Sequence, residues 1–348
     1  MKEKMVILSG ELIGEVLSRN IYDSKGTLVV SKNTTINERI LYKMENFNIG
    51  SLYIYDKEEF ENKDELNFKE LKKEYKEGIR NIKDIIENLT AGKDMTEEEI
   101  LGTFDFMDSR TYGNNLIIAC VESLKDIDDY TYTHSVNVAL YAMLIGKWLK
   151  LRQTDIKKII LAGLLHDIGK SKTPPHILNK RGRLSPHEFE EMKKHTIHGY
   201  NISKNVYNID KNVQQAVLMH HERIDGCGYP LGVKGNQIGL YARIIAVADV
   251  YDALTSKRVY KDKMTPFKTF DEMIKMGYGH FDAKIMLTFF NNLTNYYLGS
   301  KVKMDSGEIG KVVYVYPYNT FKPVVKTERA IIDLLSKGKD DISEIICE

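Results

Sequence analysis

Two pairs of adjacent residues in this sequence could carry metal chemistry. His166-Asp167 places an imidazole beside a carboxylate, and His220-His221 adds two more imidazoles. Divalent metal ions of hard to borderline character bind such nitrogen and oxygen ligands. If both pairs serve one metal centre, the protein is a hydrolase. If they do not, it is a mostly helical protein without visible chemistry.

Further candidate ligands recur along the chain at intervals of roughly 30 residues, about the length of one helical hairpin. Antiparallel packing brings such positions together in the core of a bundle, where ligands from facing helices commonly build dinuclear sites. The candidates in this series are His134, His166, Asp167, His195, His220, His221 and Asp249.

The apolar runs before several of these residues favour a metal site over isolated core histidines. A single histidine at the end of an apolar helix is more often a hydrogen-bonded core residue than a ligand. In this chain, however, an apolar run precedes each of three candidates: His166, His220 and Asp249. A buried imidazole or carboxylate needs a partner, because an unpaired buried charge is costly. Metal ions would satisfy several of these groups at once.

A dinuclear centre of this composition would hydrolyse phosphate esters. Two metal ions about 3.5–4 Å apart would share Asp167 as a bridging carboxylate, and a hydroxide held between them would attack phosphorus in line. A ligand set of imidazoles and carboxylates suits iron or manganese at least as well as zinc. Lys170 would face the site and bind a phosphate oxygen, and Arg258 and Lys261 are further phosphate-binding candidates.

The elements that must position these residues form a helical region between two small β-rich units. Residues 115–298 contain apolar helical segments divided by polar turns, and the expected helices include 135–149, 154–165, 185–207 and 212–220. Residues 1–60 have the pattern of short strands and a hairpin, and residues 299–348 have a second β pattern. Residues 61–114 are expected to be a connecting helical segment, for which a packed amphipathic helix is favoured over a dimerising coiled coil. A homodimer through this segment stays open.

Composition limits the possible partners and location. The chain of 348 residues carries 50 Lys+Arg against 49 Asp+Glu, and this balance argues against a binder of polymeric nucleic acid. The 3 cysteines lack metal-site spacing and indicate a reducing compartment. No signal peptide is visible, and no apolar run is long enough to span a membrane. We therefore expect a cytoplasmic protein.

The chain resembles the HD-GYP domain, a bacterial branch of the HD phosphohydrolases. The likeness rests on HDIGK at 166–170 and HHERIDGCGYP at 220–230, and it covers roughly 115–298. It implies a mainly α fold with a helical-bundle, metal-dependent phosphohydrolase core. It also implies the metal ligands named above, phosphate contacts from Lys170 and Arg258, and a pocket shaped by Tyr229. The implied reaction is hydrolysis of cyclic di-GMP to linear pGpG.

One position departs from the family pattern. Some members carry a glutamate four residues before the first histidine as a ligand for a third metal, and Tyr130 stands there in this chain. Asp128 and Asp129 lie nearby but out of helical register. We therefore expect two metal ions, with further cleavage to GMP left open. Another cyclic dinucleotide, such as cyclic GMP-AMP, and a catalytically inactive nucleotide-binding domain remain alternatives.

Overall fold

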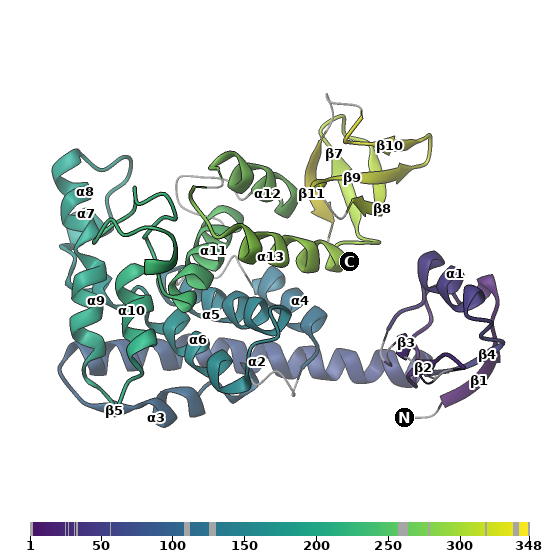
Figure 1. The fold of residues 1–348 in the computed structure, drawn as a ribbon, viewed down its shortest axis with the longest axis horizontal. Coiled ribbons are helices and arrows are strands. Elements are labelled where there is room, and N and C mark those ends of the chain that lie inside the picture. Colours follow the sequence, from purple (N-terminus) through teal and green to yellow (C-terminus); the bar gives the residue numbers. More distant parts are fainter. Residues whose placement is uncertain are drawn as a thin grey trace. The chain divides into compact units, whose positions relative to one another are not determined.

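The chain forms two compact units, Met1–Leu71 and Lys72–Glu348. Figure 1 shows the computed structural model, in which most of each unit is described. The described residues are 3–24, 26, 28–30, 32, 34–55, 57–107, 112–124, 130–256, 264–277, 279–316, 319–336 and 341–346.

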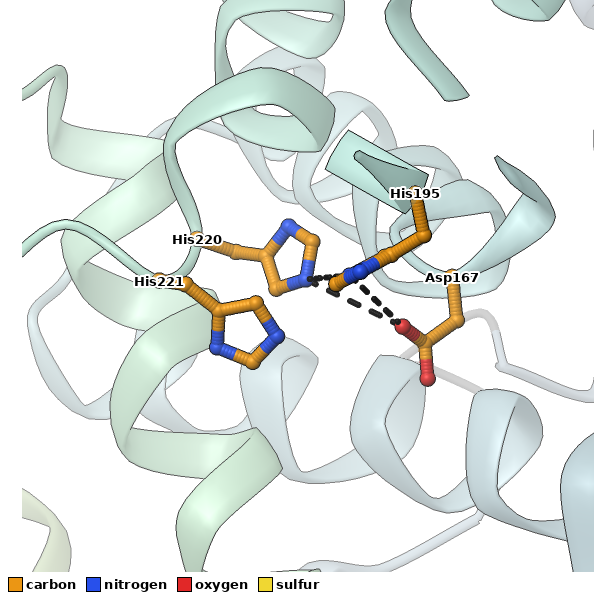
Figure 2. Close-up of side chains that lie close together, drawn as sticks. All are labelled: Asp167, His195, His220 and His221. Carbon is orange, nitrogen blue, oxygen red and sulfur yellow. Dashed lines mark hydrogen bonds and ion pairs between the residues drawn. The ribbon is translucent and has the colours of Figure 1, made fainter. Parts of the chain in front are cut away.

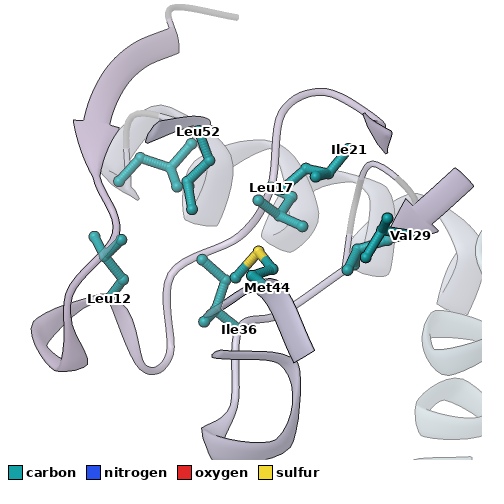
Figure 3. Close-up of a cluster of buried hydrophobic side chains, with 9 residues drawn as sticks. Leu12, Leu17, Ile21, Val29, Ile36, Met44 and Leu52 are labelled. Carbon is teal, nitrogen blue, oxygen red and sulfur yellow. The ribbon is translucent and has the colours of Figure 1, made fainter. Parts of the chain in front are cut away.

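The described part of the N-terminal unit contains short antiparallel strand pairs, the 3-10 helix η1 (Gly10–Leu12), helix α1 (Glu38–Asn46) and the first part of α2 (Lys57–Thr90). Strand β1 (Glu3–Ile7) pairs with β4 (Ser51–Tyr55), and β2 (Ile21–Tyr22) pairs with β3 (Leu28–Val30). Helix α1 is capped by Asn37, whose side chain accepts a hydrogen bond from the Ile40 amide. The unit has its own apolar core, part of which Figure 3 shows: Leu12, Leu17, Ile21, Val29, Val30, Ile36, Met44, Leu52 and Ile54.

Helix α2 (Lys57–Thr90) is a single helix of 34 residues. Its second half is amphipathic as expected, with Tyr75, Ile79 and Ile82 buried on one stripe. Its charged first half extends the helix well beyond the apolar pattern. After it come β5 (Met95–Thr96), α3 (Glu97–Gly102), η2 (Asp105–Met107) and α4 (Asn114–Leu124).

The helical core surrounds α5 (Tyr130–Trp148), which is buried along most of its length. Helix α6 (Gln153–Leu165) packs closely against it, because Gly163 has no side chain. A Cβ atom there would lie 2.6 Å from the Ala139 Cα. The remaining elements of this core are η3 (Ile168–Lys172), α7 (Pro175–Leu178), α8 (Pro186–Lys193), α9 (His195–Ser203), β6 (Val206–Tyr207), α10 (Lys211–Met219), η4 (Gly235–Gln237), α11 (Leu240–Thr255), α12 (Pro266–Lys275) and α13 (Ala283–Tyr296).

A five-stranded antiparallel sheet ends the chain, in the order β10-β9-β8-β7-β11. It packs on α12, where the Thr265 hydroxyl donates to the Ile342 carbonyl and Lys268 pairs with Asp305. Its strands are β7 (Lys301–Met304), β8 (Ile309–Tyr316), β9 (Asn319–Thr327), β10 (Ile331–Asp333) and β11 (Ile342–Ile346). The expected class, a mainly α fold with small β-rich units near both ends, is thus confirmed.

Within the described part of the chain, we find no helix with both the length and the apolar character needed to cross a bilayer.

Candidate metal centre

Breaks and ends of helices bring most of the candidate ligands to one place. His166 follows the last residue of α6 and Asp167 precedes η3, while His195 begins α9 and His220 follows α10. His134 and Asp249 lie within α5 and α11, which pack against each other. Figure 2 shows the rings of His195 and His220 directed at the Asp167 carboxylate, with His221 beside them.

Asp167 lies at the centre of the cluster, with a different pair of histidines near each of its carboxylate oxygens. Its Oδ1 lies 3.4 Å from His195 Nε2 and 3.8 Å from His220 Nε2. Its Oδ2 lies 3.3 Å from His166 Nε2 and 3.8 Å from His134 Nε2. Two groups of possible metal ligands therefore share this one carboxylate: Asp167 with His195, His220 and His221, and Asp167 with His134 and His166.

Asp249 lies near one histidine of each group. Its Oδ1 lies 3.0 Å from His134 Nε2, and its Oδ2 lies 3.9 Å from His221 Nδ1. The structure therefore gathers every residue of the expected ligand series into one cluster, and all of them except the half-buried His221 are buried.

Backbone carbonyls fix the orientation of three of the rings. The Nδ1 atoms of His166, His195 and His220 lie 2.8, 2.8 and 2.9 Å from the carbonyl oxygens of the residues three positions earlier. A carbonyl can only accept, so each Nδ1 carries the proton and each Nε2 keeps a lone pair directed into the cluster. This is the tautomer in which a histidine binds a metal through Nε2.

Asp252 was not among the sequence candidates, and it orients the fourth ring. It is fully buried, and its Oδ2 lies 2.7 Å from His134 Nδ1. The pattern that could have revealed it is the spacing of three residues from Asp249, which places both carboxylates on one face of α11. Carboxylates that accept the second ring proton of a metal-binding histidine are a common outer layer of metal sites.

Burial and neighbouring charges set the protonation of the cluster. Burial lowers the pKa of His195, His220 and His221, to about 3 for His221, and keeps these rings neutral. Burial alone would raise the pKa of Asp167, but neighbouring groups, foremost the charge of Lys170, outweigh it and hold that pKa well below its usual range.

His134 behaves differently from the other rings. Burial alone would lower its pKa, but hydrogen bonds to Asp249 and Asp252 raise it to about 9. In the protein without metal, this ring therefore favours a proton on Nε2, directed at Asp249, in addition to the Nδ1 proton directed at Asp252. A metal ion at Nε2 would take the place of the Nε2 proton, since metal binding and protonation compete for the same lone pair.

The Gly-Tyr-Pro segment borders the cluster. Glu222 Oε1 accepts hydrogen bonds from the amides of Leu231 and Gly232 at 2.6 and 3.1 Å and so closes the loop. The Tyr229 ring lies over His221, with 4.8 Å between ring centroids. A pocket of about 320 Å³ opens here, lined by Phe189, Lys193, His221, Arg223, Tyr229 and His280 among others.

Among the expected phosphate contacts, Lys170 is the one that the structure describes. Its Nζ lies 2.5 Å from Asp167 Oδ2, and its side chain is 28% exposed. Arg258 and Lys261 lie outside the described residues, as do Asp128, Asp129 and the side chain of Tyr130.

Comparison with known proteins gives the class of the domain. Residues 120–285 match the family model described as HD domain. The chain is 38% identical over 237 residues to "Cyclic di-GMP phosphodiesterase PA4108" of Pseudomonas aeruginosa, covering 65% of this chain and 57% of the relative. It is 35% identical over 174 residues to "3'3'-cGAMP-specific phosphodiesterase 1" of Vibrio cholerae, covering 48% and 39%. The chain thus spans about half the length of these curated relatives.

A solved structure shares the fold. The HDG"Y"P protein Bd1817 from Bdellovibrio bacteriovorus matches with a TM-score of 0.51 and 15% identity, over 84% of this chain and 99% of the other. Residues 120–285 are therefore an HD domain. With the Gly-Tyr-Pro segment beside the site, this domain is similar to the HD-GYP branch of that family.

The residues present fit the metal ions on which HD-domain phosphohydrolases depend. His166 Nε2 and Asp167 Oδ1 are buried, and neither makes a hydrogen bond to any described residue. Such unsatisfied buried atoms are costly unless another partner binds them. Both atoms face the cluster, where a divalent cation would satisfy them.

Proposed function

We propose that this chain is a metal-dependent phosphodiesterase that hydrolyses cyclic di-GMP to linear pGpG in bacterial second-messenger signalling. The observation that carries the proposal is the buried cluster around Asp167, set in an HD domain. The relative with 38% identity, named a cyclic di-GMP phosphodiesterase, supports this substrate.

The proposed centre holds two divalent ions, with iron or manganese as the metal. Asp167 would bridge them, because it belongs to both ligand groups. His134 and His166 would hold one ion, while His195, His220 and His221 would hold the other. Asp249 would complete the set, since its two oxygens face His134 and His221. This division follows from the distances between the ligand atoms.

When bound, the ions would lower the pKa of a water and neutralise charge on the phosphate. The chain's own residues would do the rest. Lys170 lies beside Asp167 with part of its side chain exposed, so its ammonium group would bind a phosphate oxygen. Tyr229 would form a wall of the substrate pocket, and Arg258 and Lys261 would supply further cations.

A turnover assay tests the proposal. Protein loaded with manganese or iron should convert cyclic di-GMP to pGpG, followed by chromatography. Asp167→Asn should lower the rate by about 10³-fold or more, because metal ions supply several kcal/mol of transition-state stabilisation. His187→Ala, which removes an exposed histidine of α8, is the matched control and should retain the wild-type rate. Metal-loaded protein that forms no linear product would contradict the proposal.

A second substrate has specific support. A relative with 35% identity is named a 3'3'-cGAMP-specific phosphodiesterase. The bases of the two dinucleotides differ while the phosphate chemistry is the same, so parallel turnover of both nucleotides by one preparation would assign the preference. Release of GMP in the same assay would show cleavage beyond pGpG and would count against a strictly two-metal site.

The same proposal covers organisation and location. Residues 115–298 would be the catalytic domain, with 61–114 as a connecting segment, 1–60 as a β-rich unit before it in the sequence and 299–348 as a β-rich unit after it. The chain would act in the cytoplasm, where a cyclic dinucleotide messenger is hydrolysed. Light scattering after size-exclusion chromatography would test for a homodimer.

A further inference from the structure

A buried series of hydrogen bonds leads from helix α2 to the ring of His134. The Tyr75 hydroxyl bonds to Asn137 Oδ1, and Asn137 Nδ2 donates to Asp252 Oδ1 at 2.9 Å. The other oxygen of Asp252 lies 2.7 Å from His134 Nδ1. Tyr75 and Asp252 are 0% exposed, and Asn137 is 1% exposed. Water therefore does not replace any of these partners.

The direction of each hydrogen bond follows from the Asp252 carboxylate. An ionised carboxylate can only accept, so Asn137 must turn its NH₂ group toward Asp252. The amide oxygen of Asn137 then faces Tyr75, which must donate its hydroxyl proton. Burial, assisted by the charge of Asp252, raises the pKa of Tyr75 well above its usual range, so the hydroxyl remains a donor.

Loss of the Tyr75 hydroxyl would remove the hydrogen bond to Asn137, which lies at the end of the series farthest from His134. Asn137 Oδ1 would lose its donor, and the amide could rotate to place oxygen against the Asp252 carboxylate. Asp252 also accepts a hydrogen bond from the Ser256 hydroxyl at 3.1 Å, so it would stay in place. Its hydrogen bond to His134 would become weaker and would orient the ring less well.

We infer that Tyr75 is a positioning residue for the metal centre, acting through Asn137 and Asp252 to hold His134 Nε2 toward the metal. The inference rests on the proposed metal-dependent function. It adds α2, a helix outside the 120–285 HD-domain match, to the structure that orients a ligand. Outer partners of metal-binding histidines commonly contribute about 10–100-fold to metal affinity or activity. Tyr75 reaches His134 only through Asn137 and Asp252, so we expect an effect on metal affinity at the lower end of this range, about 10-fold.

The first test compares two tyrosine variants that each remove one hydroxyl contact at α2. Tyr75→Phe should raise the Mn²⁺ dissociation constant about 10-fold, measured by competition with a fluorescent chelator. It should also lower kcat with little change in KM. Tyr112→Phe is the control, because the Tyr112 hydroxyl bonds at 2.9 Å to Glu74, the neighbour of Tyr75, which is not a residue of the metal cluster. It should keep the wild-type Mn²⁺ affinity.

A double-mutant cycle separates positioning from general packing. If Tyr75 acts through Asp252, then adding Tyr75→Phe to Asp252→Asn should weaken Mn²⁺ binding no further. Additive losses would overturn the inference, and so would a Tyr75→Phe variant with wild-type Mn²⁺ affinity and kcat. Wild-type protein that binds no Mn²⁺ or does not hydrolyse the dinucleotide would instead count against the proposed function. If Tyr75→Phe does not fold, Asn137→Ser breaks the same series one residue later and should weaken Mn²⁺ binding; unchanged binding would overturn the inference.

Discussion

Carbonyl oxygens near helix ends decide which ring nitrogen of three histidines is available. His166, His195 and His220 each donate from Nδ1 to the carbonyl three residues earlier. The last carbonyls of a helix have no partner within the helix, so a ring at that position can use one. These short contacts leave every Nε2 facing Asp167, and the same local geometry is repeated on three separate elements.

Two cysteines are expected to differ sharply in reactivity. Cys120 is buried and Cys227 is exposed. Burial raises the pKa of the Cys120 thiol from 9.0 to about 12, so iodoacetamide at pH 8 should alkylate Cys227 and spare Cys120 in the folded protein. Peptide mapping by mass spectrometry measures both rates. Equal rates under native conditions would contradict the structure, and denaturant should make them equal.

The same pKa shift has a defined consequence for stability. The unfolded thiol of Cys120 loses its proton from about pH 9, whereas the folded thiol keeps it to about pH 12. The unfolded state therefore binds fewer protons in this window, and the free energy of unfolding should fall as the pH rises through it. A Cys120→Ser variant should lack this part of the alkaline decline in equilibrium unfolding experiments.

The sequence indicated which histidines and carboxylates would lie together, but not the residues that orient them. Every candidate ligand lies in the cluster. These residues could be predicted because their types and their hairpin spacing can both be read from the sequence. Asp252, Asn137 and Tyr75 were missed, since their importance comes from partners on other helices. A buried asparagine or tyrosine alone carries no sign of which atom it contacts.

At the level of elements, the closest approach beside the site is between η3 and α9. A Cβ atom on Gly169 would lie 1.9 Å from the His195 carbonyl oxygen and 2.4 Å from the Gly199 amide nitrogen. Backbone atoms cannot move aside as a flexible side chain can. The glycine of the HDIGK segment therefore sets the distance between Asp167 and His195.

Gly169→Ala should push α9 away and impair the site. We expect a loss of stability of about 1–3 kcal/mol from overpacking and a fall in activity of about 10²-fold, as a displacement near 1 Å can produce. Thermal unfolding and Mn²⁺ titration would measure both effects. Gly146→Ala is the control, because its nearest neighbour would be the Ile156 side chain at 3.3 Å. A Gly169→Ala variant that matches this control would contradict the packing described here.

The helices of the core were largely predictable, whereas their interruptions were not. The expected segments at 154–165 and 212–220 correspond to α6 and α10. The expected helix at 185–207 is instead divided between α8 and α9 at Lys194 and ends at Ser203. Local propensity does not predict this break, because its benefit is tertiary: it turns His195 toward Asp167. In the same way, the charged first half of α2 has no apolar stripe that would indicate a helix.

For the whole molecule, metal binding and folding should be linked. The cluster exists only in the folded chain, so metal binds the folded state preferentially. At a free metal concentration of 100 times the dissociation constant, this stabilises the fold by about 2.7 kcal/mol. Chelation should therefore lower the unfolding temperature of wild-type protein, measured by calorimetry. Asp167→Asn should respond much less, and an equal response would show that the chelated metal lies elsewhere.

The continuity of α2 has a mechanical consequence. The helix starts two positions after β4 of the N-terminal unit and reaches Tyr75 without a break. An α-helix rises 1.5 Å per residue and resists compression along its axis. The hydrogen bond from Tyr75 to Asn137 is lost once its atoms separate beyond about 3.5 Å. A shift of α2 along its axis by about two residues, or about 3 Å, would therefore break this hydrogen bond and release the series that orients His134.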